Sequence, residues 1–170
     1  YLYIGKLLLN QKRRDYSKIN EEYNSGIWNR PFSDIEFESS SGNYERKDAN
    51  EYSIFTNNDK LFKGRRTEYE AKYQKQIFNV LDNYIDNQIV ELGCGLGSNL
   101  FQLYHRKFQK LEGYDISENA ISLANQYSKN KGYDIHFGVC DMNKPLPMIK
   151  DKIVFTRACM EQLKHTMSNV

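Results

Sequence analysis

The sequence predicts an α/β fold, in which helices cover both faces of a mostly parallel sheet. From about residue 67, helix-like apolar periodicity alternates with short apolar runs that are bounded by turn residues. The first of these runs ends directly before Gly93, Gly95 and Gly97, where the backbone can turn sharply from a strand into a helix. We therefore expect a doubly wound sheet that binds ligands at the carboxyl ends of its strands.

Residues 1–64 differ in texture from the rest of the chain. They are rich in Asn, Ser, Tyr and charged residues, with breaks at Gly26 and Pro31 and no long periodic stretch. We expect an irregular or helical N-terminal extension or cap with loops, a hairpin and a short helix near residues 7–9. Its aromatic residues, Tyr23 among them, could cover a bound ring or form the core of an added helical cap.

The elements of the remaining chain follow in a regular order. Strands are expected at 89–92, 111–115, 135–139 and 152–156, and helices at 67–84, 97–108 and 117–132. Ser117 is the predicted N-cap of the last helix, and Gly132 is its stop. The apolar stripe predicted for the first helix comprises Tyr69, Tyr73, Ile77, Val80, Leu81 and Tyr84.

The chain continues only briefly after the fourth predicted strand. The residues that remain suffice for one helix at most, so the far half of a doubly wound sheet is not in this sequence. The sequence also begins with Tyr1 rather than Met. We therefore expect a sheet truncated after its fourth strand and a sequence that is a fragment of a longer protein.

Composition and charge exclude several kinds of partner. The 24 Lys and Arg residues nearly balance 22 Asp and Glu, so a nucleic-acid partner is not expected. No apolar run approaches the ~20 residues that cross a bilayer, so we expect a cytoplasmic protein without a membrane partner. Cys94, Cys140 and Cys159 share no metal-ligand spacing, so we expect reduced thiols and no metal site.

Polar residues follow each of the four predicted strands. Glu91 ends the first, Asp115 ends the second, Asp141 follows the third and Thr156 ends the fourth. Because the carboxyl ends of parallel strands meet at one edge, we expect these residues near the glycines, where Asp115 can accept hydrogen bonds from ribose hydroxyls. The Gly-x-Gly-x-x-Gly pattern of dinucleotide sites is not met, because Ser98 stands where glycine or alanine is required.

The run from Glu91 to Gly97 resembles the first motif of the class I S-adenosylmethionine-dependent methyltransferases. Residues 112–117 resemble the second-strand motif of that family, residues 140–142 its adenine-side motif, and residues 151–155 the strand before its acceptor site. The resemblance implies a Rossmann-like domain over residues 65–170, S-adenosylmethionine as cofactor, and methyl transfer as the reaction.

The resemblance also implies roles for individual residues. Glu91 would lie near the methionyl ammonium, the alternative being a cap on the following turn. Asp141 would accept a hydrogen bond from the adenine amino group while Ile116 or Met142 packs on the ring, the alternative being a cap on its own turn. Cys94 contributes compact packing. The predicted cofactor-binding set is Glu91, Gly93, Cys94, Gly95, Gly97, Asp115, Ile116, Asp141, Met142 and Thr156.

The residues that would act on the methyl acceptor are predicted from the C-terminal end of the sequence, residues 156–165. Glu161 and His165 stand four apart on an expected helix, so either could act as general base, although both could be ordinary helix residues. Residues 156–163 resemble bacterial sugar O-methyltransferases, which implies a small-molecule hydroxyl acceptor, possibly on a sugar. Two other functions remain open: an NAD(P)-dependent oxidoreductase and a non-catalytic cofactor- or partner-binding module. Arg65, Arg66 and Tyr69 are candidates to reach the methionyl carboxylate.

Overall fold

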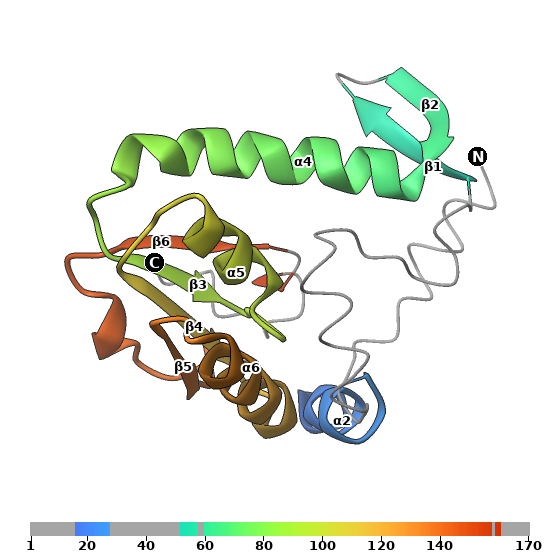
Figure 1. Cartoon of the computed structure of the whole chain (residues 1–170). Helices are drawn as coiled ribbons and strands as arrows, with labels where there is room; N and C mark the ends of the chain where they lie inside the picture. The colour runs from blue at the N-terminus through green and yellow to red at the C-terminus, as the bar shows by residue number, and fades with distance from the viewer. Residues whose placement is uncertain (1–15, 28–51, 58–59, 158, 161–170) are drawn as a thin grey trace.

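The computed structural model describes residues 16–27, 52–57, 60–157 and 159–160. In this part of the chain, a parallel sheet with its helices forms the main body, and a hairpin and an N-terminal helical segment are attached to it (Figure 1). The short helix expected near residues 7–9 lies outside the described residues. The predicted division between residues 64 and 65 falls at the end of the hairpin and stays a prediction.

Four parallel strands form the sheet. They are β3 (Ile89–Leu92), β4 (Leu111–Asp115), β5 (Ile135–Val139) and β6 (Ile153–Thr156), in the order β5-β4-β3-β6. Glu91 is in register with Gly113 of β4 on one side and Phe155 of β6 on the other. Strand order therefore reverses at β3, and the glycine turn after β3 lies where open α/β sheets bind ligands.

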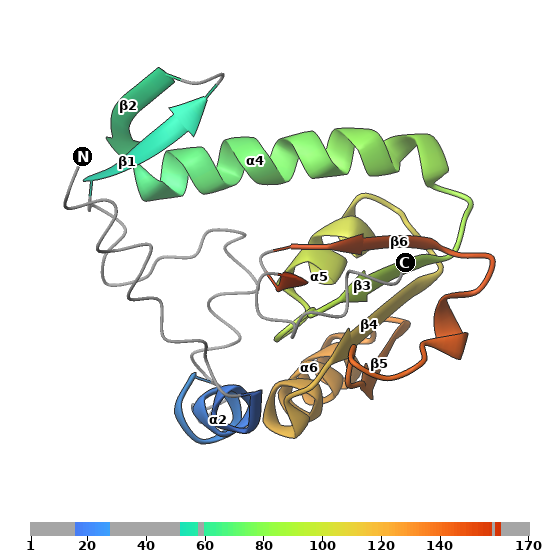
Figure 2. The same ribbon diagram turned by 180° about the vertical axis from the view of Figure 1, so that it is seen from behind.

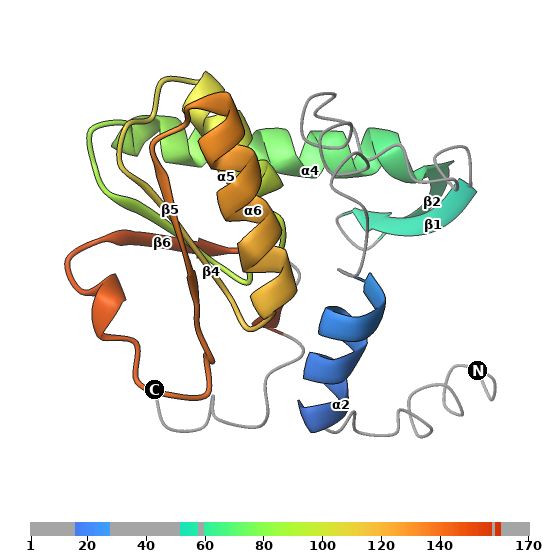
Figure 3. The same ribbon diagram turned by 60° about the horizontal axis from the view of Figure 1, so that its bottom comes forward.

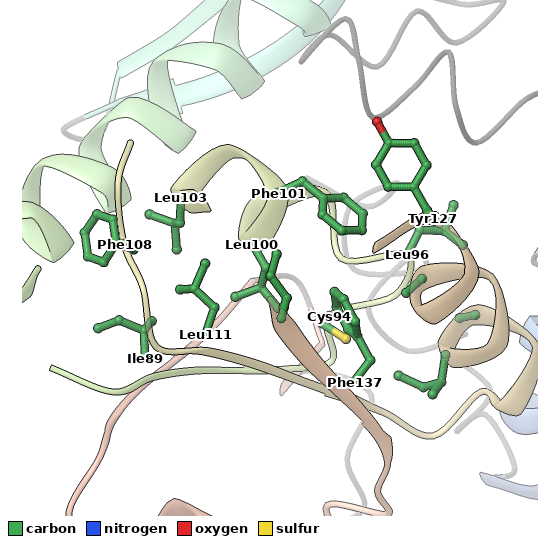
Figure 4. Packing of buried hydrophobic residues seen from close by; sticks show 14 of the residues in the cluster. Ile89, Cys94, Leu96, Leu100, Phe101, Leu103, Phe108, Leu111, Tyr127 and Phe137 are labelled. Carbon is green, nitrogen blue, oxygen red and sulfur yellow. The ribbon is translucent and has the colours of Figure 1, made fainter. Parts of the chain in front are cut away.

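Three of the described helices pack against one face of this sheet. They are α4 (Arg66–Leu81), α5 (Ser98–His105) and α6 (Glu118–Lys131). Figure 4 shows the core that they form with the strands, in which Leu100, Phe101 and Leu103 of α5 are almost completely buried. The predicted caps of α6 are confirmed: the side chain of Ser117 accepts from the amide of Ala120, and Gly132 ends the helix at a φ of 69°. The predicted strands and the α/β class are also confirmed.

The opposite face of the sheet is covered differently. Val90, Leu92, Tyr114 and Cys140 are buried there, and the loop around the short 3-10 turn η3 (Pro147–Ile149) packs on them. No α-helix of the described residues contributes to this second cluster, whereas the sequence predicts helices on both faces. The reason is the connection from β5 to β6, where two prolines disfavour a longer helix.

Helix α4 carries a hairpin at its start and extends beyond the sheet, as Figures 1 and 2 show. Strands β1 (Tyr52–Asn57) and β2 (Lys60–Arg65) pair antiparallel, and Phe55 stacks on Tyr69 of α4 at a centroid distance of 4.3 Å. The predicted apolar stripe is wrong at Tyr73, Val80 and Tyr84, which are 47%, 60% and 40% exposed. Of the described side chains of this helix, Ile77, Phe78 and Leu81 pack into the sheet core.

The N-terminal segment consists of α2 (Tyr16–Glu21) and the π-helical turn η1 (Glu22–Ile27). Figure 3 shows it next to α6, in the direction of the carboxyl ends of the strands. It is therefore placed close to the edge of the sheet at which a ligand is expected.

Candidate functional site

The turn after β3 is built from three glycines with positive φ. Their φ angles are 71° at Gly93, 52° at Gly95 and 79° at Gly97, which residues with a Cβ rarely adopt. A Cβ at Gly97 would come within 2.5 Å of the Phe137 ring. Gly97 is also the N-cap of α5, so the turn leads the chain directly into that helix. The positive φ angles and the close packing both explain why glycine stands here.

Asp115, at the end of β4, is bonded to the glycine turn. Its Oδ2 accepts from the amide of Gly95 at 2.8 Å, and its Oδ1 accepts from the amide of Ser117 at 2.9 Å. Burial raises the pKa of Asp115, although these amides act in the opposite direction. Each carboxylate oxygen can accept a further hydrogen bond. The carboxylate is therefore oriented and retains capacity for ligand hydroxyls.

Glu91 is the most unusual group at this edge. It is 1% exposed, its Oε1 accepts from Asn99 Nδ2 at 2.6 Å, and its Oε2 is buried with no hydrogen-bond partner among the described residues. Burial raises the pKa of Glu91 to about 8, against the opposing effects of the Asn99 hydrogen bond and the Arg157 charge. Burying an unpaired polar oxygen costs stability, so this atom indicates a missing donor. The predicted alternative, a cap on the following turn, is not what these hydrogen bonds show.

Three residues that the predicted set lacks complete the polar group around Glu91. Gln74 Nε2 of α4 donates to Asn99 Oδ1 at 2.8 Å, and Arg157 Nη1 donates to the same oxygen at 3.3 Å. Together these donors orient the Asn99 amide so that its Nδ2 faces Glu91. Arg157 had one sequence signal, since it directly follows the fourth strand, whereas Gln74 and Asn99 had none.

Thr156 reaches the same edge from β6. Its hydroxyl contacts the sulfur of Cys159, which in turn donates to the carbonyl of Leu92 at 3.3 Å. A Cβ at Gly93 would come within 2.5 Å of Cys159 Sγ. Cys159 therefore packs directly against the glycine turn, a position that its sequence spacing did not predict.

Asp141 caps its own turn. Its Oδ1 accepts from both the amide and the side-chain Nδ2 of Asn143 at 3.0 Å, and Lys144 Nζ lies 3.7 Å from its Oδ2. This is the capping alternative of the sequence analysis, and a contact with adenine stays a prediction. Met142 lies near the glycine turn, since its Cε is 3.8 Å from the position of a Cβ at Gly93. Ile116 is half-buried beside Asp115.

Cys94 points into the core between α5 and the sheet (Figure 4). Burial raises the pKa of the Cys94 thiol well above its usual range, and the nearby Glu91 and Asp115 add to this effect. The thiol therefore remains protonated, which fits the predicted packing role and not that of a nucleophile.

The described part of the chain does not place the remaining predicted residues in this group. Glu161, His165 and the side chain of Arg66 lie outside the described residues. Arg65 Nε lies 4.0 Å from Glu68, and Tyr69 packs against the hairpin. Among the described side chains, Arg157 is a cation placed beside the Glu91 group, through its hydrogen bond to Asn99. Among the described side chains, no group of three His, Cys, Asp or Glu residues could hold a metal ion.

The family of the chain follows from its second half. Residues 86–169 match the model of a family described as a methyltransferase domain, and they include all four strands of the sheet and the glycine turn. Residues 86–169 form a methyltransferase domain. Its cofactor is S-adenosylmethionine. The predictions of family and cofactor are thereby confirmed.

Several solved structures are similar to part of the chain. The PH0226 protein from Pyrococcus horikoshii OT3 is 30% identical, with a TM-score of 0.37, over 46% of this chain and 37% of that one. An S-adenosylmethionine-dependent methyltransferase from Clostridium acetobutylicum ATCC 824 is 19% identical, with a TM-score of 0.41, over 51% of this chain and 35% of that one. This chain thus spans only about a third of the length of these proteins.

No curated protein matches this chain at a significant level. None of the described helices of the methyltransferase chain is long and apolar enough to cross a membrane.

Proposed function

We propose that this chain is the cofactor-binding part of an enzyme that transfers a methyl group from S-adenosylmethionine to a hydroxyl of a small molecule, such as a saccharide. The observation that carries the proposal is the buried Oε2 of Glu91, which has no donor among the described residues. The methionyl ammonium would supply both the missing donor and a positive charge that favours the ionised carboxylate.

The other residues at this edge fit the remaining parts of the cofactor. Asp115 retains lone pairs for the ribose hydroxyls, and its position is held by Gly95 and Ser117. Arg157, beside Asn99, has the charge that the methionyl carboxylate requires. The proposed set also includes Gly93, Cys94, Gly97, Ile116, Asp141, Met142 and Thr156.

The acceptor is proposed from chemistry and sequence. The cofactor supplies an electrophilic methyl group on a positively charged sulfur. For the transfer, the protein must hold the acceptor hydroxyl in line at ~3 Å and exclude water. Glu161 or His165 is the proposed general base that takes the hydroxyl proton. The resemblance of residues 156–163 to sugar O-methyltransferases supports the choice of a hydroxyl.

The cofactor site can be tested by calorimetry with S-adenosylhomocysteine and with NAD. We expect S-adenosylhomocysteine to bind and NAD not to bind. Asp115→Ala should weaken binding by roughly 1–3 kcal/mol, because it removes charge-assisted hydrogen bonds. Asp134→Ala, which changes an exposed Asp before β5, is the matched control and should leave the dissociation constant unchanged. Binding of NAD alone would instead support the oxidoreductase.

The acceptor can be tested in the full-length protein with radiolabelled S-adenosylmethionine and a panel of saccharides. Glu161→Gln or His165→Ala should abolish methyl transfer while S-adenosylhomocysteine still binds. Full binding without transfer to any acceptor would support the non-catalytic module.

A further inference from the structure

Asn24, in the turn η1, connects the N-terminal segment to the first turn of α6. Its Oδ1 accepts from the hydroxyl of Ser117 at 2.6 Å and from the amide of Asn119 at 3.3 Å. Its backbone carbonyl accepts from Asn119 Nδ2 at 2.7 Å. Three hydrogen bonds therefore join residues that are more than ninety positions apart in the sequence.

These bonds give α6 a second capping residue. The hydroxyl of Ser117 accepts from the amide of Ala120 at 3.2 Å while it donates to Asn24. The amides of Asn119 and Ala120 belong to the first turn, where a helix has no internal acceptors. The side-chain oxygen of Asn24 accepts from the amide of Asn119. It also orients the hydroxyl of Ser117, which accepts from the amide of Ala120.

Ser117 is also hydrogen-bonded to Asp115 of the proposed cofactor site. The amide of Ser117 donates to Asp115 Oδ1 at 2.9 Å, and the amide of Gly95 donates to Asp115 Oδ2 at 2.8 Å. A continuous hydrogen-bonded chain thus runs from Asn24 through Ser117 and Asp115 to Gly95 in the glycine turn. Ser117 is fully buried when the N-terminal segment is in place, so Asn24 supplies the acceptor for its hydroxyl.

The side chain of Asn24 is itself held in place. Its Nδ2 donates to Asn20 Oδ1 of α2 at 3.0 Å, which leaves its Oδ1 directed at α6. The orientation of the amide therefore depends on the helical segment being intact and in contact with α6.

We infer that Asn24 is a positioning residue for cofactor binding. By holding Ser117, it keeps the carboxylate of Asp115 directed along the ligand edge. Cofactor binding and the docking of residues 16–27 on α6 then stabilise each other, since such a coupling is reciprocal. The inference rests on the proposed contact of Asp115 with the cofactor ribose.

The first test measures S-adenosylhomocysteine binding by calorimetry to the wild type, Asn24→Ala and Asn24→Asp. Asn24→Ala should bind about 3- to 10-fold more weakly, because it removes an acceptor of two hydrogen bonds. Asn24→Asp should lose less affinity than Asn24→Ala, because its carboxylate still accepts both bonds from α6 although it no longer donates to Asn20. Ser25→Ala, on an exposed neighbour in the same turn, should leave the affinity unchanged. Equal affinities of wild type and Asn24→Ala would overturn the inference.

The second test needs no ligand, so it separates this inference from the proposed function. Hydrogen exchange resolved by NMR should be faster in Asn24→Ala at the amides of Ser117 and Gly95, and unchanged at Val90 in the centre of β3. Unchanged exchange at Ser117 and Gly95 would overturn the hydrogen-bonded chain, whether or not the wild type binds S-adenosylhomocysteine. Failure of the wild type to bind that compound, with faster exchange in the variant, would count against the proposed function alone.

Discussion

Glu91 and Glu112 are buried glutamates on the neighbouring strands β3 and β4, and their carboxylates have no hydrogen-bond partner in common. Glu91 faces the helices and receives one side-chain hydrogen bond, from Asn99. Glu112, on the opposite face, accepts from Lys152 Nζ at 2.7 and 2.9 Å, from the Tyr114 hydroxyl at 2.9 Å, and from Gln88. The first carboxylate is poorly paired, and the second has both a cation and neutral donors.

The two pKa values differ accordingly. Burial raises the pKa of Glu91 to about 8. At Glu112 burial acts in the same direction, but the hydrogen bonds from Lys152 and Tyr114 outweigh it and hold the pKa below its ordinary value. Burial, with the hydrogen bond to Glu112, raises the pKa of Tyr114 to about 12, so its hydroxyl stays a donor. A buried carboxylate in a fully paired network supports the fold, whereas an underpaired one indicates a ligand.

Removal of the cation beside Glu112 should have the largest effect. Lys152→Ala should lower the free energy of unfolding by about 2–4 kcal/mol, because it leaves a mostly buried carboxylate without its counter-charge. S-adenosylhomocysteine affinity should not change. Chemical denaturation measures the loss, and Lys150→Ala, on an exposed lysine of the same loop, is the control. A loss no larger than that of the control would show that Glu112 does not depend on Lys152.

Exchanging each glutamate for glutamine should sharpen the contrast. Glu91→Gln should weaken S-adenosylhomocysteine binding by about 1.5–3 kcal/mol, because a charge-assisted hydrogen bond is lost. Glu112→Gln should leave that affinity unchanged and lower the stability instead. Calorimetry measures the affinity of both variants, and chemical denaturation measures their stability. Equal losses of affinity in the two variants would remove the distinction between them.

The protonation of Glu91 should make ligand binding depend on pH. Between pH 6 and 7.5 the free carboxyl is mostly protonated, since its pKa is about 8. A ligand ammonium favours the ionised form, so binding releases a proton and the affinity rises with pH, by at most about 1.4 kcal/mol per pH unit. Titrations in two buffers of different ionisation enthalpy measure this proton. It should be absent in Glu91→Gln, and a pH-independent affinity of the wild type would contradict the assignment.

The smallest effect is expected at the neutral donor of Glu112. Tyr114→Phe should lower the free energy of unfolding by about 0.5–1.5 kcal/mol, because one hydrogen bond to the carboxylate is lost while Lys152 remains. Urea denaturation measures the change. Tyr133→Phe, which removes a hydroxyl bonded to exposed His105, is the matched control. Weaker binding of S-adenosylhomocysteine in Tyr114→Phe would show that the two faces of the sheet are coupled.

Much of the fold was predictable because its signals are local. The strands at 89–92, 111–115 and 135–139 and the caps of α6 appear where the apolar runs and the Ser117 and Gly132 signals predict them. The apolar stripe of α4 was partly wrong, because periodicity does not reveal that the helix extends beyond the sheet, which leaves Tyr73 exposed. Burial of a helix face depends on what lies opposite, and that is not a local property.

The candidate site also contains some residues that the sequence predicted and others that it did not. The glycine turn and Asp115 were predictable, because parallel strands bring their carboxyl ends to one edge whatever the details of packing. Gln74, Asn99 and Asn24 were not predictable, since each acts through a partner at least eight positions away and carries no motif.

The sequence by itself determined the order of strands and helices along the chain and the glycine turn, because backbone preference encodes them, and the resemblance of residues 91–97 to a methyltransferase motif indicated the cofactor. Only the tertiary structure decided that Glu112 is paired and Glu91 is not. Hydrogen bonds between distant residues depend on which side chains the packed sheet brings within about 3 Å, and two glutamates that look alike in the sequence acquire different chemistry from that packing.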